Sequence, residues 1–163
     1  AHGGNRAIST LLVDQINQTA AGVAVSFGEA VRPFMEPSDE PPSTVLDRHG
    51  GTGETSSSLY LMPDLVQLDQ AVPAELTLPA HLEAMLPDVV AGDPTALQLF
   101  LAEGLKAEET GKQTSSAEMS TTGVWGTRDP REGSAARGAA DMRRTIDAAV
   151  RFIDRWNEYD AVE

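Results

Sequence analysis

The sequence predicts an α/β fold in which helices cross over a mostly parallel sheet. Apolar residues in the segment 5–20 recur at the spacing of one helix face, and Gly22 is placed to end that helix. The apolar run that follows, at 23–27, is typical of a short buried strand. A helix that leads directly into a strand is the order of elements found in parallel sheets with crossover helices.

The centre of the chain predicts loops around one clear helix. An acidic, proline-rich segment at 36–47 is expected to form a surface loop. The segment 53–68 leaves two interpretations open, a Ser/Thr-rich turn or a helix with one apolar face. Asp93 and Pro94 then open a helix. Its apolar stripe consists of Leu97, Phe100, Leu101 and Leu105.

The last third predicts an exposed loop and a long amphipathic helix. The polar segment 107–122 has few apolar residues and is expected to be the loop. Asp129 is the expected cap of the helix and Pro130 its first residue. A single apolar stripe follows at helical spacing, made of Ala135, Ala139, Met142, Ile146, Val150, Ile153 and Trp156.

Composition narrows the class of protein. A length of 163 residues fits one domain or part of one. The net charge of −13 disfavours binding to nucleic acid or to anionic membranes. The absence of cysteine excludes disulfides, thiolate nucleophiles and cysteine zinc sites. With no long apolar segment and no signal-peptide pattern, a cytoplasmic location is expected.

The residues best suited to chemistry are histidines beside glycines. His2 and His49 are each followed by a Gly-Gly pair, which lets a backbone approach a ligand closely. The plainer interpretation is that both are ordinary glycine-rich turns. Glu54 follows His49 by five residues and either caps a helix or joins a histidine on a divalent cation. His81 lies among leucines and is expected to be structural or on the surface.

Three motifs in order resemble those of the creatininase (creatinine amidohydrolase) family. They are "HGGN", then "HGGTGETSSSLYLMPDLV", then "GVWGTRDPREGSAARG". In that family the corresponding patterns are G-H-G-G-N, then H-A-G-x-x-E-T-S followed by Pro-x-Leu-Val, and G-V-x-G-D-P. The resemblance implies a layered α/β/α fold and a metal-dependent hydrolase of cyclic amides, formamides or related C–N bonds. It also implies two divalent ions, Zn, Mn or Fe.

Carried over by position, the resemblance assigns roles to individual residues. His2 and Glu54 match metal-binding positions, and His49 matches the histidine that shuttles a proton to the leaving group. The loop Gly3, Gly4 and Asn5 is expected to line the substrate. Some relatives carry a glutamate where Gly4 stands here.

The chain also departs from the family pattern. Ala1 replaces a glycine, and Gly50 replaces the alanine of H-A-G. Thr127 and Arg128 are inserted between "GVWG" and "DP", and the dipeptide at 133–134 replaces Ala-Thr. The two last changes affect the expected pocket wall. They leave the substrate open, and the loops at 36–47 and 107–122 are the expected specificity elements.

In the family, a further motif precedes G-H-G-G-N and consists of Glu-x-His with a later Asp. The sequence does not contain that motif. Residues 1–163 are therefore expected to be the C-terminal portion of a single α/β domain. The partners expected are a small-molecule substrate, the N-terminal half or a complementary chain, and further copies in a homo-oligomer. Two alternatives stay open, a non-catalytic binding subunit of the same fold and an inactive fragment.

Overall fold

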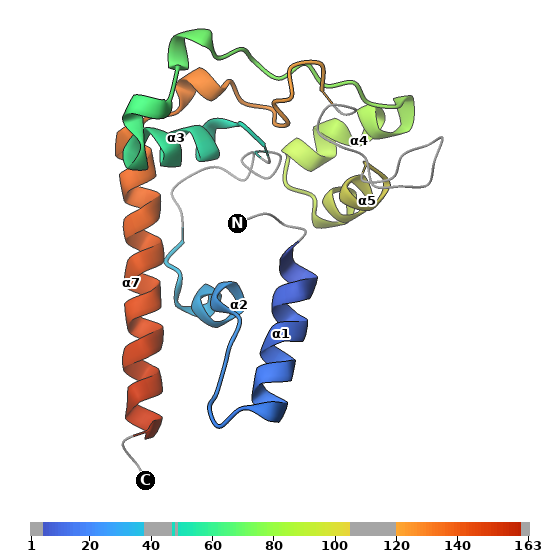
Figure 1. The fold of residues 1–163 in the computed structure, drawn as a ribbon. Coiled ribbons are helices and arrows are strands. Elements are labelled where there is room, and N and C mark those ends of the chain that lie inside the picture. Colours follow the sequence, from blue (N-terminus) through green and yellow to red (C-terminus); the bar gives the residue numbers. More distant parts are fainter. Residues whose placement is uncertain (1–4, 38–46, 48, 105–119, 161–163) are drawn as a thin grey trace. The chain divides into compact units, whose positions relative to one another are not determined.

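The computed structural model describes residues 5–37, 47, 49–104 and 120–160 (Figure 1). The α-helices are α1 (Asn5–Thr19), α2 (Phe27–Val31), α3 (Thr52–Leu61), α4 (Ala80–Val90), α5 (Pro94–Gly104) and α7 (Ala135–Asp160). Short 3₁₀ turns are η1 (Arg32–Phe34), η3 (Pro63–Leu65), η4 (Leu68–Gln70) and η5 (Pro130–Glu132). The chain divides into two compact units, one of Ala1–Pro37 with Arg143–Glu163 and one of Ser38–Met142.

The β-structure of the described residues consists of two isolated antiparallel bridges. One joins His49 to Trp125 and the other joins Leu76 to Ser120. The mostly parallel sheet expected from the sequence is therefore not found in the described part of the chain. The helices expected on either side of such a sheet are present.

Helix α1 confirms the prediction for the first segment, but the strand predicted at 23–27 is wrong. Val23 and Val25 are 71% and 43% exposed, and Phe27 begins helix α2. The side chain of Asn17 both accepts from Ala24 N, at 2.7 Å, and donates to Ala24 O, at 2.9 Å. These bonds take up the backbone groups that a neighbouring strand would otherwise pair.

An aromatic cluster joins η1 to the second half of α7. The ring of Phe152 contacts Phe34 at 6.0 Å and Trp156 at 5.4 Å between centroids, both edge to face. Arg151 donates to Phe34 O at 2.6 Å and pairs with Glu36 at 3.4 Å. This part of α7 is thus attached through one face, on which Ala148 is fully buried.

The apolar stripe predicted for α7 is only partly buried. Ile146, Val150 and Ile153 are each about half exposed, at 53%, 49% and 52%. The aromatic contacts are made by Phe152, which the predicted stripe leaves out, with Phe34 and with Trp156, the last member of the stripe. The helix is confirmed from Ala135 onward, and only part of its predicted apolar face is covered.

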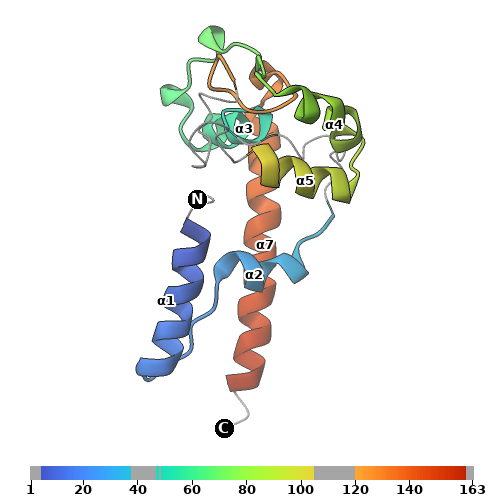
Figure 2. The same cartoon turned by 90° about the vertical axis from the view of Figure 1, so that its right-hand side faces the viewer.

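A hydrophobic core in the second unit is built on the α4–α5 pair, whose helices lie side by side in both views (Figure 1 and Figure 2). Its buried residues are Leu82, Val89, Phe100 and Trp125. Asp93 Oδ1 accepts from Ala96 N at 2.7 Å, which confirms the predicted start of α5. Leu97 and Leu101 pack against this core as their spacing predicts.

The start of the last helix differs from the prediction. Asp129 caps η5, a single 3₁₀ turn, and α7 begins only after Gly133 and Ser134. Ser134 then accepts from Arg137 N at 3.2 Å through its hydroxyl and from Gly138 N at 3.0 Å through its carbonyl. Ser134 therefore supplies the cap that the sequence suggested for Asp129.

The first turns of α7 lie directly on the backbone of α3. A Cβ at Gly138 would overlap the carbonyl oxygen of Ser56 and would lie 2.6 Å from its carbonyl carbon and 3.0 Å from Ser57 N. Backbone atoms inside a helix cannot give way as a flexible side chain can. Only glycine allows this approach of the two helices.

Gly138→Ala is therefore expected to destabilise the protein by about 1–3 kcal/mol, although alanine favours a helix over glycine. The measurement is the free energy of unfolding in urea. The matched control is Gly28→Ala in α2, where a Cβ would meet nothing within 4 Å. Equal stability of the two variants would contradict the close approach of α7 to α3.

Candidate functional site at the start of helix α3

His49 lies at the surface and is held through its backbone by Trp125. His49 N donates to Trp125 O at 3.2 Å, and Trp125 N donates to His49 O at 2.8 Å. The two rings stack with centroids 6.2 Å apart, and Trp125 stacks in turn on Phe100 at 6.3 Å. Trp125 is 6% exposed whereas His49 is exposed. The stack connects an accessible imidazole to the hydrophobic core.

The segment 120–125 is fixed from its other side by the chain before α4. Thr121 N donates to Glu75 O at 3.0 Å, and Thr121 Oγ1 donates to Glu75 Oε2 at 2.7 Å. Thr122 Oγ1 donates to Pro73 O at 3.2 Å. Hydrogen bonds from Thr121 and Thr122 therefore hold the loop in place a few residues before Trp125, which contacts His49.

A glycine turn follows His49 and leads into α3. Gly50 has a φ of 63°, in the left-handed region that favours glycine. Gly50 N donates to Glu54 Oε2 at 2.8 Å, and Thr55 N donates to Gly51 O at 2.9 Å. Glu54 lies in the first turn of α3, where the helix dipole favours a carboxylate. The capping role considered for Glu54 is thus present in the structure.

Asp47 is part of this turn and was not singled out from the sequence. Its Oδ2 accepts a hydrogen bond from Gly53 N. Its Oδ1 is buried without a hydrogen-bond partner and occupies the position that a Gly51 side chain would take. The available signal was the pattern Asp-x-His followed by glycines at 50, 51 and 53.

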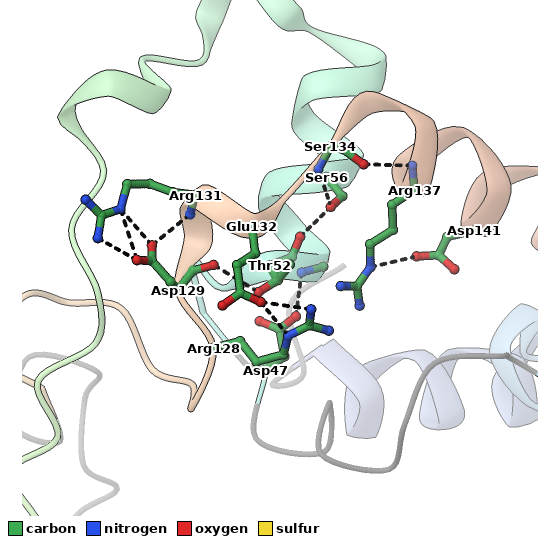
Figure 3. A network of polar contacts seen from close by, with 11 residues as sticks. Asp47, Thr52, Ser56, Arg128, Asp129, Arg131, Glu132, Ser134, Arg137 and Asp141 are labelled. Atoms are coloured by element: carbon green, nitrogen blue, oxygen red, sulfur yellow. Dashed lines mark hydrogen bonds and ion pairs between the residues drawn. The ribbon is translucent and has the colours of Figure 1, made fainter.

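Helix α3 is anchored to the third motif through two buried hydroxyl residues (Figure 3). Ser56 Oγ donates to Thr52 O at 2.6 Å and accepts from Ser134 N at 3.1 Å. Thr52 Oγ1 lies 3.3 Å from Asp129 O, to which it donates. Both Thr52 and Ser56 have no exposed surface. The second and third motifs therefore form one structural element.

The charged residues around η5 pair with one another. Arg131 makes bonds of 2.5–3.0 Å with the Asp129 carboxylate, and Arg128 bonds Glu132 at 2.9 and 3.1 Å (Figure 3). The side-chain hydrogen bond from Arg131, then the bond from its backbone N–H, lowers the pKa of Asp129 below its ordinary value. The carboxylate of Asp129 is thus the cap of η5.

The predicted site residues fall into two groups. His49 and Glu54 lie in one turn within the second unit. His2, Gly3 and Gly4 lie outside the described residues. Asn5 is the exposed first residue of α1, where its carbonyl accepts from Ser9 Oγ at 2.9 Å. His81 is exposed on α4, in agreement with its expected surface position.

Metal-binding donors are present, but the described residues do not complete a metal site. No three of their His, Asp and Glu side chains form a group that would hold an ion. One oxygen of Glu54 is already bonded to Gly50 N. A bound ion requires three or more protein ligands that converge on one point. His49, Glu54 and Asp47 do not form such a group.

Comparison with known proteins gives the family. A family model described as creatininase, creatinine amidohydrolase, matches residues 1–153. The chain belongs to the creatininase family. The predicted resemblance is confirmed. No curated protein matches the chain.

One solved structure is similar to this creatininase-family chain. It is described as "Putative creatinine amidohydrolase" from Bacteroides fragilis, with 18% sequence identity and a TM-score of 0.49. The match covers 93% of this chain and 49% of that protein. The chain thus spans about half the length of that relative.

Among the residues described, no helix is both long and apolar enough to cross a membrane.

Ser56→Ala is expected to destabilise the protein by about 1–3 kcal/mol, because it removes the acceptor of the Ser134 N–H. The free energy of unfolding measures this loss. Ser57→Ala, one residue further along α3 and only half buried, is the matched control. Losses of equal size would show that the Ser56–Ser134 bond does not join the motifs.

The stability difference between the wild type and Asp129→Asn should depend on pH. Because the folded protein lowers the pKa of Asp129, its pairing stabilises the fold above the ordinary carboxyl pKa of about 4. That contribution is lost as the pH falls through the lowered pKa. Thermal unfolding at a series of pH values should show a small difference near neutrality that vanishes in acid. A constant difference would contradict the pairing.

Proposed function

We propose that this chain contributes the proton-transfer part of the active site of a metal-dependent hydrolase that cleaves a C–N bond in a small molecule. A cyclic amide or a formamide is the proposed substrate class. The observation that carries the proposal is the accessible His49 imidazole, held by two backbone hydrogen bonds and by stacking on Trp125. A fixed imidazole at the surface of a rigid core suits a proton donor, because proton transfer requires a defined geometry.

The proposed role of His49 is to carry a proton to the departing nitrogen. Cleavage of a C–N bond leaves an amine, which is a poor leaving group unless it gains a proton as the bond breaks. Imidazole takes up and releases protons near neutral pH. The indole of Trp125 stacks on the imidazole, and His49 is nevertheless exposed, as access of a substrate would require.

Metal binding is proposed for His2 and Glu54 together with donors from outside the described residues. Two Zn, Mn or Fe ions are the proposed complement, and bound ions would supply an activated water and charge stabilisation. The bond from Gly50 N orients the Glu54 carboxylate while leaving its other oxygen available. Gly3, Gly4 and Asn5 are proposed to line the substrate.

The remaining donors are proposed to come from an N-terminal half or a complementary chain, within a layered α/β/α domain that assembles as a homo-oligomer. Exposed apolar residues on α1 support the need for further polypeptide. Ile8, Leu11 and Leu12 are 65%, 68% and 58% exposed on this helix. An apolar helix face of this kind is normally covered by another element.

The test measures turnover and metal content of the full assembly with creatinine and a panel of cyclic amides and formamides. His49→Ala should lower kcat about 10²- to 10⁴-fold while the metal content stays unchanged. His81→Ala is the matched control, because that histidine is exposed on α4 and belongs to none of the three sequence motifs. Unchanged turnover in His49→Ala would remove His49 from the mechanism.

The second candidate is a non-catalytic subunit of the same family. It is favoured by one observation, that the described residues contain no group of three metal-binding side chains. Less than about one divalent ion per assembled site, together with no turnover of any substrate in the panel, would support this candidate over the hydrolase.

A further inference from the structure

We infer that Asp47 is a positioning residue that holds the turn between His49 and Glu54 in its active geometry. The inference deepens the proposed function and rests on it for the role of His49. The packing of the Asp47 carboxylate against Gly51 and Gly53 can be tested by stability measurements that need no enzyme assay. Among the described residues, the hydrogen bond of Asp47 goes to Gly53 N, so it acts on His49 and Glu54 through the glycines between them.

The carboxylate of Asp47 fills the space beside two glycines. Its Oδ2 accepts from Gly53 N, in the first turn of α3. A Cβ at Gly51 would overlap Oδ1 and would lie 2.8 Å from Asp47 Cγ. A Cβ at Gly53 would lie 2.9 Å from Oδ2. Side chains at either position would therefore displace the carboxylate.

The need for glycine at position 51 comes from the Asp47 side chain and not from the backbone conformation. Gly51 has φ −79° and ψ −168°, an extended conformation that any residue adopts. Its ideal Cβ has Asp47 atoms as its three nearest contacts. If the Asp47 side chain were removed, alanine at position 51 would become sterically acceptable.

The turn that Asp47 supports contains both proposed site residues. Gly51 follows Gly50, whose N–H binds Glu54 and whose preceding residue is His49. Gly51 O accepts the first helical bond of α3, from Thr55 N. Without the carboxylate, Gly53 N loses its acceptor and the first turn of α3 loses a negative group that its dipole favours. The distance between His49 and Glu54, at the two ends of the turn, is then no longer fixed.

The experiment is a double-mutant cycle of Asp47→Ala and Gly51→Ala, with Asp64→Ala as an exposed-carboxylate control. Each single variant should lower Tm by about 5 °C. The double variant should unfold at the same temperature as Asp47→Ala alone, because the clash at Gly51 has been removed. Additive losses in Tm would overturn the proposed seat of the carboxylate.

Kinetics of the full assembly separate positioning from stability. With Asp47→Ala, kcat should fall about 10- to 100-fold with little change in KM. The double variant should stay equally slow although its Tm shows no further loss. A wild-type kcat in Asp47→Ala, despite a lower Tm, would show that Asp47 serves stability alone.

A spectroscopic measurement keeps the inference testable if the proposed function fails. In a Trp156→Phe background, Trp125 is the single tryptophan of the chain. Asp47→Ala should shift Trp125 emission to longer wavelength, because the stacked and backbone-paired His49 is no longer held against it. Asp64→Ala should not. An unchanged spectrum in Asp47→Ala would contradict positioning of His49, and absent turnover with a shifted spectrum would contradict only the hydrolase.

Discussion

The candidate site depends on the contact between the backbones of α7 and α3 at Gly138. Because a Cβ there would lie 2.6 Å from the Ser56 carbonyl carbon, the two helices approach as closely as backbones allow. That approach brings Ser134 N within 3.1 Å of Ser56 Oγ, so that the buried hydroxyl of Ser56 accepts a hydrogen bond from the amide that precedes α7. The third motif therefore fixes the helix that carries Glu54.

A second constraint acts from the hydrophobic core. The rings of Phe100, Trp125 and His49 form a stack that begins in the α4–α5 core and ends at the surface. The α7 contact holds the body of α3, whereas this stack holds the chain just before it. The turn between His49 and Glu54 is thus attached at both ends to parts of the chain more than 50 residues away.

Local signals explain which parts of the fold could be predicted. Helices α1 and α5 follow from apolar spacing and, for α5, from the cap at Asp93. The strand expected at 23–27 failed because a strand needs a partner, and Asn17 satisfies Ala24 instead. Asp129 was expected to cap the long helix and caps η5 instead, because the chain breaks before α7 where Ser134 N bonds Ser56 of another motif.

The site shows the same limit at the scale of single residues. His49 and Glu54 were proposed from their motif, whereas the contacts of Asp47 with Gly53 and of Trp125 with His49 appear only in the folded chain. The capping bond of Glu54 does not conflict with the ligand role proposed for it. One of its oxygens accepts from Gly50 N, and a carboxylate has a second oxygen with its own lone pairs. The bond from Gly50 N therefore restrains the Glu54 carboxylate beside the first turn of α3 and leaves its second oxygen outside that bond.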